Sequence, residues 1–492
     1  MGVLGKLASQ TVIYGLSSIL GRFLNYLLVP LYTYTFSAAE YGVVSEFYAY
    51  AGFFSVVLAL GLETGYFRFR REPGYDPAQV YSAALSVALA LNLLVFAAAW
   101  LGRQAVADWL RYADHPEYVV IFAGLLCMDA VCAIPFAKLR AENRAWRFAG
   151  VKFAEILLTI ALNLFFILGW RELEVYTPPE WPPLLHYQAQ FGVAYIFLAN
   201  LLASAAKFFW LAPELSGLRL PALPLLPPLL KYSLPMVITG LAGAVNETLS
   251  RAILKILLPY DTATNLKMLG IFGACYKLSV LMTLFVQAFR YAAEPFFFSL
   301  AGRGDAKRNY ALVMQYFVLV GMGIFLFVSL FIDFFQYFIG PEFRAGLGVT
   351  PILLLANLCL GMYVNLSVWY KLSDRTGLGA LTAVLGAGLT IGLNIWWIPR
   401  WGYVGSAWAT LLCYAFMVCL SWLFSRFYYP VNYPLGKIAY YWLLGLGLYW
   451  ADDYLIRQYG WQVWSAGGLC LAVYCLAALS LDIPKFLKSR RL

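Results

Sequence analysis

The chain has 492 residues, of which 62% are hydrophobic and only 12% are charged, and its mean hydropathy is +0.72. Soluble domains carry about 25% charged residues, so this composition excludes an ordinary soluble protein and predicts a polytopic membrane protein. The net charge of +10 lies largely in segments between apolar runs. We therefore expect membrane lipids as partners and no nucleic acid.

Residue patterns argue against an enzyme. The eight cysteines all fall inside apolar runs, which predicts no disulfide framework, and the two histidines stand apart in polar loops, which predicts no metal site. The sequence contains neither a G-x-x-x-x-G-K-[ST] phosphate loop nor an H-E-x-x-H pair. No loop is long enough for an extramembrane catalytic domain, so we expect no enzymatic activity and no cofactor.

Apolar runs follow one another along the whole chain, each long enough to cross the hydrocarbon core of a bilayer. The first run, residues 10–36, is too long for the core of a signal peptide. The sequence predicts an all-α protein of about fourteen transmembrane helices, over residues 10–36, 42–67, 80–101, 118–138, 153–169, 188–212, 233–258, 270–298, 310–332, 349–370, 377–398, 403–425, 438–455 and 463–481.

Lys and Arg residues between these runs are concentrated in every second loop. Cytoplasmic loops carry such an excess. The pattern stays in register through every predicted crossing, so it predicts that both termini are cytoplasmic.

The chain also repeats itself. Leu158–Trp170 reads L-T-I-A-L-N-L-F-F-I-L-G-W and Leu389–Trp401, 231 positions later, reads L-T-I-G-L-N-I-W-W-I-P-R-W, while Lys138-Leu139 matches Lys371-Leu372. The alternative is chance similarity between apolar segments. A repeat predicts two parallel six-helix lobes: residues 1–212, a cytoplasmic linker over 213–231, a second lobe over 232–425, and helices 13 and 14 with a basic tail over 426–492.

Several predicted helices carry charges that are costly in lipid, at roughly 2.5–3.5 kcal/mol each at mid-membrane. Arg22 lies halfway along the first helix, with Asn25 one turn later. In the seventh helix, Glu247, Arg251 and Lys255 share one face because they are four residues apart. They form either an internal Glu247–Arg251 ion pair or a ladder for an anionic group.

The eighth helix carries Lys277, which lacks a partner on its own helix, and then Arg290 and Glu294, whose spacing favours a structural pair over a binding site. In the first lobe, Asp129 is central in its helix, where it either pairs with Arg22 or binds a coupling cation. Lys207 lies near a helix end, and we expect it to snorkel towards the headgroups.

Several segments resemble bacterial polysaccharide-biosynthesis flippases. They are V-P-L-Y-T at Val29–Thr33, R-A-E-N-R-A-W-R-F at Arg140–Phe148, Y-S-L-P at Tyr232–Pro235, N-E-T-L-S-R-A-I-L-K-I-L-L-P at Asn246–Pro259, Q-A-F-R-Y-A-A-E-P-F-F-F at Gln287–Phe298 and S-V-W-Y-K-L-S-D-R-T-G at Ser367–Gly377. The resemblance covers nearly the whole chain. It is to the O-antigen and lipopolysaccharide branch of the multidrug/oligosaccharidyl-lipid/polysaccharide exporter superfamily.

This resemblance implies a flippase of the bacterial cytoplasmic membrane that moves an isoprenoid-diphosphate-linked oligosaccharide by alternating access, for the synthesis of cell-surface polysaccharide. Cations in its cavity would bind the diphosphate, and the candidates are Arg22, Arg251, Lys255, Lys277 and Arg290, with Asn25, Asp129, Glu247 and Glu294 in supporting or coupling roles. Many relatives carry an acid where this chain has Ser250, so a role for that acid does not transfer.

The alternative function is an ion-coupled exporter of drugs or small solutes from the same superfamily. It predicts acidic groups that receive cationic substrates, whereas cations outnumber acids at the positions above. Na⁺, H⁺ or the membrane potential are the expected sources of driving force. Other membrane proteins of polysaccharide assembly are further candidate partners.

Overall fold

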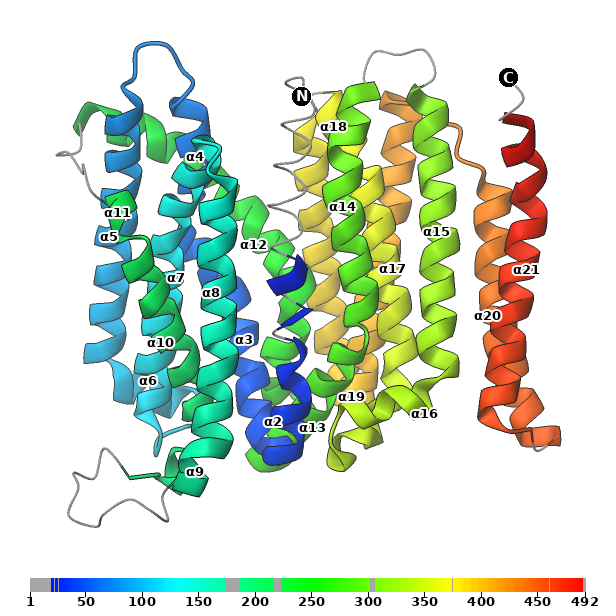
Figure 1. Cartoon of the computed structure of the whole chain (residues 1–492), viewed down its shortest axis with the longest axis horizontal. Helices are drawn as coiled ribbons and strands as arrows, with labels where there is room; N and C mark the ends of the chain where they lie inside the picture. Colours follow the sequence, from blue (N-terminus) through cyan, green and yellow to red (C-terminus); the bar gives the residue numbers. More distant parts are fainter. Residues whose placement is uncertain are drawn as a thin grey trace. The chain divides into compact units, whose positions relative to one another are not determined.

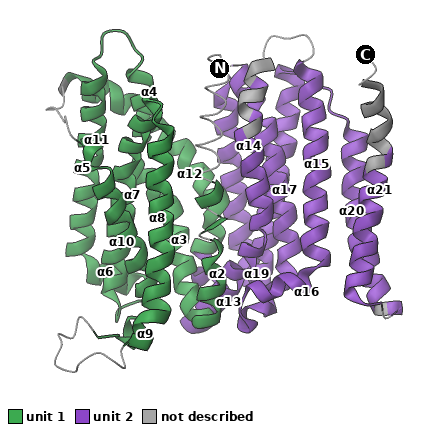
Figure 2. Cartoon of the chain, viewed as in Figure 1, with its two compact units in different colours: residues 1–252 green, residues 253–492 purple. Residues whose placement is uncertain are grey.

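The computed structural model describes residues 19–21, 23–24, 26–173, 186–215, 223–300, 306–373, 375–459 and 461–489. Within these ranges the chain forms helices and no β-strand, which confirms the all-α prediction. The chain, drawn in Figure 1, divides into two compact units, Met1–Ala252 and Ile253–Leu492, which have different colours in Figure 2. The boundaries of the two lobes, of the linker and of the two C-terminal helices remain a prediction.

The first unit is built from helices of very different lengths. They are α2 (Leu28–Thr35), α3 (Ala38–Ala59), α4 (Leu62–Phe69), α5 (Pro77–Leu101), α6 (Arg103–Trp109), α7 (Pro116–Ala141), α8 (Ala145–Leu164), α9 (Trp170–Leu173), α10 (Ala194–Trp210), α11 (Ala212–Leu215) and α12 (Leu226–Leu257), whose last turns lie in the second unit. Helix α8 continues through a wider turn, Phe165–Gly169.

The second predicted transmembrane helix is not continuous. Leu60 and Gly61 adopt left-handed backbone angles, with φ of 47° and 63°, and separate α3 from α4. A Cβ at Gly61 would lie 2.8 Å from the backbone oxygen of Ser233 on α12. Glycine is therefore required by both the backbone angle and the close approach of α12.

The second unit contains α13 (Thr262–Leu278), α14 (Val280–Leu300), α15 (Ala306–Leu330), α16 (Ile332–Phe335), α17 (Thr350–Leu366), α18 (Val368–Leu372), α19 (Thr376–Tyr428), α20 (Leu435–Tyr459) and α21 (Val463–Ser489). Gly402, with φ 58° and ψ −143°, breaks α19 into two helices. These two parts match the predicted eleventh and twelfth helices.

The eighth predicted helix, residues 270–298, is not one straight helix in the structure. Helices α13 and α14 meet at Ser279 and are bent by 49°. The Ser279 hydroxyl donates to the Tyr276 carbonyl at 2.7 Å and accepts from the Asn357 amide at 3.0 Å. These polar contacts stabilise a break that the apolar pattern does not reveal, because both halves are apolar.

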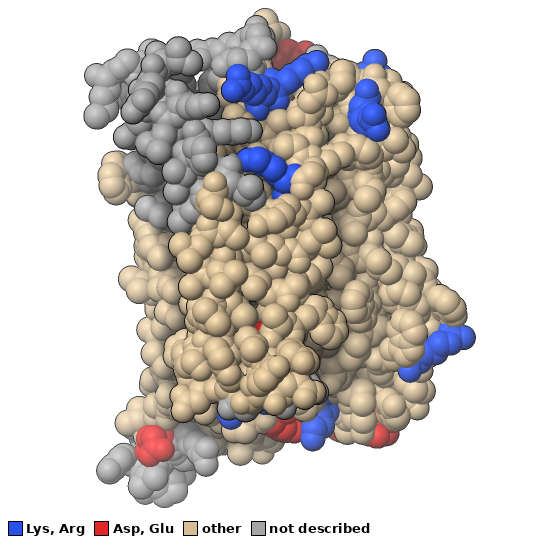
Figure 3. Space-filling model, turned by 90° about the vertical axis from the view of Figure 1, so that its right-hand side faces the viewer, with Lys and Arg blue, Asp and Glu red and all other residues tan. Residues whose placement is uncertain are grey.

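Among the described residues, eight helical stretches are long and apolar enough to cross a membrane, or nine when the bent α13–α14 pair is counted. The 53-residue α19 is counted once in that number, although Gly402 breaks it into two helices. Figure 3 shows a broad band with few charged atoms on one face, with most Lys and Arg side chains towards its ends. The chain is a multi-pass membrane protein, and the count of fourteen helices remains a prediction.

Matching positions of the predicted repeat have matching contacts. Asn163 on α8 and Asn394 on α19 are each fully buried. The side-chain amide of each donates at 2.8 Å to the carbonyl four residues earlier, on Thr159 and Thr390 respectively. Asn92, Asn200 and Asn357 make the same bond to the carbonyl four residues earlier, so this contact is common in these helices and the repeat remains a prediction.

Candidate functional site

The first unit contains a charged cavity, here called the N-terminal pocket, with a volume of about 270 Å³. Its walls come from α4, α7, α8 and α10. Three acids, three bases and two aromatic rings line it together with Ala133: Glu63, Asp129, Glu155, Arg140, Lys152, Lys207, Phe136 and Phe148.

Lys207 is at the centre of the ionic contacts of this pocket. Its Nζ lies 2.6 Å from Asp129 Oδ1 and 2.6 Å from Glu155 Oε1, and the residue is only 2% exposed. Ser204 also donates to Asp129 Oδ1. The prediction that Lys207 snorkels to the headgroups was therefore wrong: two carboxylates from other helices provide a closer polar environment than the interface does.

The other charges of the N-terminal pocket are paired as well. Lys152 Nζ lies 3.1 Å from Glu155 Oε2, and an Arg140 nitrogen lies 2.6 Å from Glu63 Oε1. The six ionisable side chains thus neutralise one another. Asp129 remains 47% exposed towards this space, but its contact with Lys207 makes it a poor site for a second cation.

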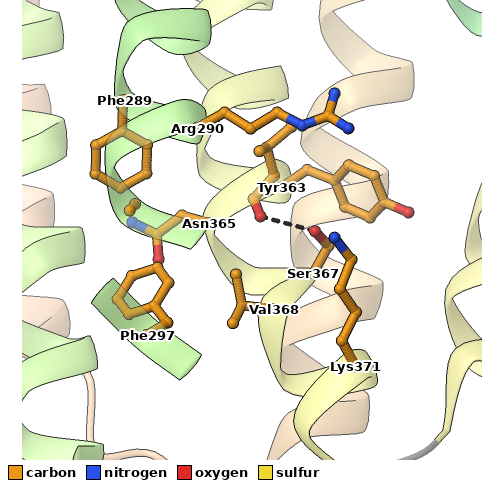
Figure 4. Close-up of a pocket in the computed structure, with 10 residues that line it drawn as sticks. Phe289, Arg290, Phe297, Tyr363, Asn365, Ser367, Val368 and Lys371 are labelled. Carbon is orange, nitrogen blue, oxygen red and sulfur yellow. Dashed lines mark hydrogen bonds between the residues drawn. The ribbon is translucent and has the colours of Figure 1, made fainter. Parts of the chain in front are cut away.

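The second unit contains another cavity, here called the C-terminal pocket, with a volume of about 240 Å³. Residues of α14, α17 and α18 line it, joined by Ser367 between the last two helices. The lining combines two cations with aromatic, aliphatic and amide groups: Arg290, Lys371, Phe289, Phe297, Tyr363, Ala293, Val364, Val368, Asn365 and Ser367. Figure 4 shows Arg290 reaching out from α14 and the Lys371 amino group extending from α18 towards Ser367.

Asn365 provides a buried donor to the C-terminal pocket. It is 4% exposed, and its Nδ2 has no hydrogen-bond acceptor within the described part of the chain. In Figure 4 its amide is seen between the rings of Phe289 and Phe297. By contrast, the Ser367 hydroxyl is satisfied by the Val364 carbonyl at 2.7 Å. An unmade hydrogen bond at a buried amide costs about 1–3 kcal/mol, and a water molecule or a polar ligand would satisfy this donor.

Two of the predicted site residues lie in these pockets, Arg290 in the C-terminal one and Asp129 in the N-terminal one. Arg22, Asn25 and the side chain of Glu294 lie outside the part of the chain that the structure describes.

The charged residues of α12 are not among the lining residues of either pocket. Arg251 donates to the backbone oxygen of Glu247 at 3.4 Å, and Glu247 is exposed. Lys255 is 3% exposed, while Lys277 is half-buried in the last turn of α13. Their predicted roles in substrate binding remain predictions.

Sequence reasoning missed Asn365 and Lys371 in one pocket and Glu155 in the other. The position of Lys371 in the S-V-W-Y-K-L segment is a signal that could have marked it. Asn365 gives no such signal, because a buried amide is recognised only when its unsatisfied donor and its cavity are both visible.

The fold is that of transporters in the superfamily that contains lipid II flippases and multidrug exporters. The chain superimposes on the lipid II flippase MurJ in an inward closed conformation with a TM-score of 0.67, at 15% identity, covering 97% of this chain and all of the other. An inward-facing multidrug transporter of the MATE family gives a TM-score of 0.66 at 12% identity, covering 85% and 94% of the two chains.

Among curated proteins, the chain is 19% identical over 439 residues to a probable low-salt glycan biosynthesis flippase, Agl15, of Haloferax volcanii, covering 88% of this chain and 86% of that protein. No family model matches the sequence. These relatives are flippases and transporters and not enzymes, in agreement with the prediction of a non-enzymatic protein.

Proposed function

We propose that this protein is a flippase that moves an isoprenoid-diphosphate-linked oligosaccharide across the bacterial cytoplasmic membrane by alternating access, in the synthesis of a cell-surface polysaccharide such as O-antigen, capsule or exopolysaccharide. Its fold and its glycan-flippase relative support this function. Both termini would lie in the cytoplasm, as the distribution of Lys and Arg predicts.

One observation carries the proposal: Arg290, in the apolar helix α14, lines a cavity together with Lys371 and Asn365. A guanidinium at membrane depth is costly unless it meets a counter-charge. The diphosphate of a lipid-linked glycan supplies such a charge, and guanidinium groups bind phosphate oxygens through strong, charge-assisted hydrogen bonds. The isoprenoid tail would meanwhile remain in the bilayer.

The alternative is an ion-coupled exporter of small cationic solutes, which the similarity to a multidrug transporter favours. Such a protein needs acidic groups that are free to receive a cation. In the N-terminal pocket, however, Asp129 and Glu155 are already bound by Lys207. The flippase therefore agrees better with the charges of both pockets. Na⁺, H⁺ and the membrane potential remain the candidate driving forces.

The test is translocation by the purified protein in liposomes. Wild-type protein should move a fluorescent polyprenyl-diphosphate glycan between leaflets, and Arg290→Met should slow it by about tenfold, the effect of about 1.4 kcal/mol of lost charge-assisted binding. The control variant is Lys307→Met, which removes an exposed cation of the same unit that contacts the Tyr429 ring. Wild-type protein that transports a cationic dye, but no lipid-linked glycan, would refute the proposal.

A further inference from the structure

Asp452 is a buried acid on α20, one of the two helices that follow the predicted lobes. The residue is only 7% exposed. Its Oδ1 has no hydrogen-bond partner, and it forms no ion pair with a residue that the structure describes. A buried carboxylate without such partners is costly, and it takes up a proton and becomes neutral instead. Asp452 is therefore a candidate site for a proton.

The helices around Asp452 are apolar. Helix α20 packs against α15 and α21, and Figure 1 shows α20 beside α21. The apolar cluster of these three helices includes Phe325, Leu330 and Cys470. The ring of Phe325 lies 5.6 Å from that of Tyr449, which is one turn before Asp452 on α20. The last turns of α15, Phe325–Leu330, contain no titratable side chain. An ionised Asp452 therefore gains little from this part of its surroundings.

The titratable neighbours of Asp452 are acids or weakly acidic groups. Asp453 on the same helix and Asp333 on α16 are close enough to act on its charge. The thiol of Cys470 on α21 and the phenol of Tyr449 are also within electrostatic reach of it. Two neighbouring carboxylates oppose a third negative charge. They therefore favour the neutral, protonated form of Asp452.

A proton suits this place better than a metal ion. In the described part of the chain, no three Asp, Glu, His or Cys side chains are arranged to hold a metal ion. The two neighbouring acids are also more open than Asp452, since Asp333 is exposed and Asp453 is half-buried. A proton needs a single carboxylate, and Asp452 alone provides it.

The site lies near the outer side of the membrane in the predicted topology. The distribution of Lys and Arg assigns the end of α20 and the end of α15 to that side. The electrostatic effect of Asp333 on Asp452 agrees with this, because it requires both helix ends to lie at the same side. Protons would therefore come from the outer solution.

We infer that Asp452 is a proton-binding site that controls the packing of α20 against α15 and α21. With the proton bound, Asp452 is neutral and remains in the apolar junction. When the proton leaves to water, a buried negative charge remains beside two other carboxylates, and α20 loosens to bring this charge towards water. A low pH outside therefore favours packed α20, and a high pH weakens its packing. This inference does not depend on the proposed function.

Hydrogen exchange of the full-length protein in nanodiscs, corrected for the intrinsic rate at each pH, tests the inference. Protection of α20 in wild type should fall by about tenfold or more from about pH 5 to about pH 8, and protection of α17 should change little. Asp452→Asn and Asp452→Leu should each abolish the fall, and the second variant decides the result if the first is misfolded. Glu342→Gln, which changes an exposed acid of the same unit, should behave like wild type.

Infrared difference spectra between the two pH values provide a second measurement, because a protonated carboxyl has a C=O band that a carboxylate lacks. Part of this signal should be lost in Asp452→Asn. An equal fall of protection in wild type and both Asp452 variants, or an infrared signal that does not depend on Asp452, would overturn the inference. So would a fall that Na⁺ or Ca²⁺ reverses at constant pH, since the ligand would then be a metal ion.

Arg457, five residues after Asp452, is the next cation along α20. Arg457→Gln should keep the wild-type fall of protection. Loss of the fall in this variant would identify an ion pair with Arg457 in place of a proton site and would overturn the inference. Neither measurement needs translocation of a glycan, so a failure of the proposed function would leave these results unchanged.

Discussion

At the scale of single residues, Lys207 shows how much depends on one buried charge. Its ammonium is the shared partner of Asp129 and Glu155, at 2.6 Å from each. Lys207→Met removes the cation and leaves two carboxylates close to each other. We expect a loss of about 2–4 kcal/mol of unfolding free energy, below the upper end for fully buried pairs because Asp129 is 47% exposed.

Thermal unfolding in detergent measures this loss. The double variant Lys207→Met, Glu155→Gln should recover part of the stability, because it removes one of the two uncompensated acids. Equal stability of wild type and Lys207→Met would contradict the role assigned to this contact.

Asp261 provides a pH-dependent contact at the start of α13. Its side chain accepts from the Thr264 hydroxyl at 2.6 Å and from the Thr264 backbone amide at 3.0 Å, and these hydrogen bonds lower the pKa of its carboxyl. A lowered pKa in the folded state means that the contact stabilises the helix above the unfolded value of about 3.9. The stabilisation is lost as the pH falls through the lower, folded value.

We therefore expect hydrogen-exchange protection of the first turn of α13 to fall below about pH 4 in wild type. Asp261→Asn keeps an acceptor and should show no such pH dependence. A similar fall in protection in both proteins would show that another group is responsible.

At the scale of helices, the approach of α4 to α12 depends on glycine. Gly61→Ala places a methyl group 2.8 Å from the Ser233 backbone oxygen, at a φ of 63° that disfavours a side chain. Backbone cannot move aside as a side-chain end can, so we expect a loss of about 2–4 kcal/mol. Thermal unfolding should show it, with Gly150→Ala as the control, because Gly150 lies within α8 and a Cβ there meets nothing within 4 Å. A smaller effect at Gly61 than at Gly150 would contradict this reading.

The short helix α11 contacts α5, the end of α7, the connection from α7 to α8 and the first turn of α8. Glu214, 2% exposed, lies 2.8 Å from Arg144 and 2.7 Å from Arg147, and its backbone oxygen accepts from Tyr81 and Lys138. Two arginines of the R-A-E-N-R-A-W-R-F segment, Arg144 and Arg147, thus bind Glu214 and fix α11 at the end of the predicted first lobe.

Glu214→Gln should loosen this anchor by about 1–3 kcal/mol, since it replaces two charge-assisted hydrogen bonds by weaker ones. Limited proteolysis should then cut between α11 and α12 faster than in wild type. Glu72→Gln is a suitable control, because Glu72 makes only a 4.0 Å contact with the exposed Arg68. Unchanged cleavage of the Glu214 variant would refute the anchor.

At the scale of the whole molecule, the predicted topology assigns each loop to one side of the membrane. Lys267 lies in a predicted outer segment and Lys307 in a predicted inner one, and both are exposed. A membrane-impermeant amine reagent applied to intact spheroplasts should modify Lys267 and leave Lys307 unmodified, as read by peptide mass spectrometry. Modification of both in permeabilised cells is the control. The reverse pattern would invert the orientation.

The sequence by itself determined the class of protein, the helical fold and most helix positions, because hydrophobic length is a local property that each segment displays alone. It also identified Arg290 and Asp129 as charges that need polar surroundings. The Lys207–Glu155 contact, the break at Ser279 and the donor of Asn365 were decided only by the tertiary structure. Each depends on which side chain of another helix lies opposite, and that pairing is a property of packing and not of sequence spacing.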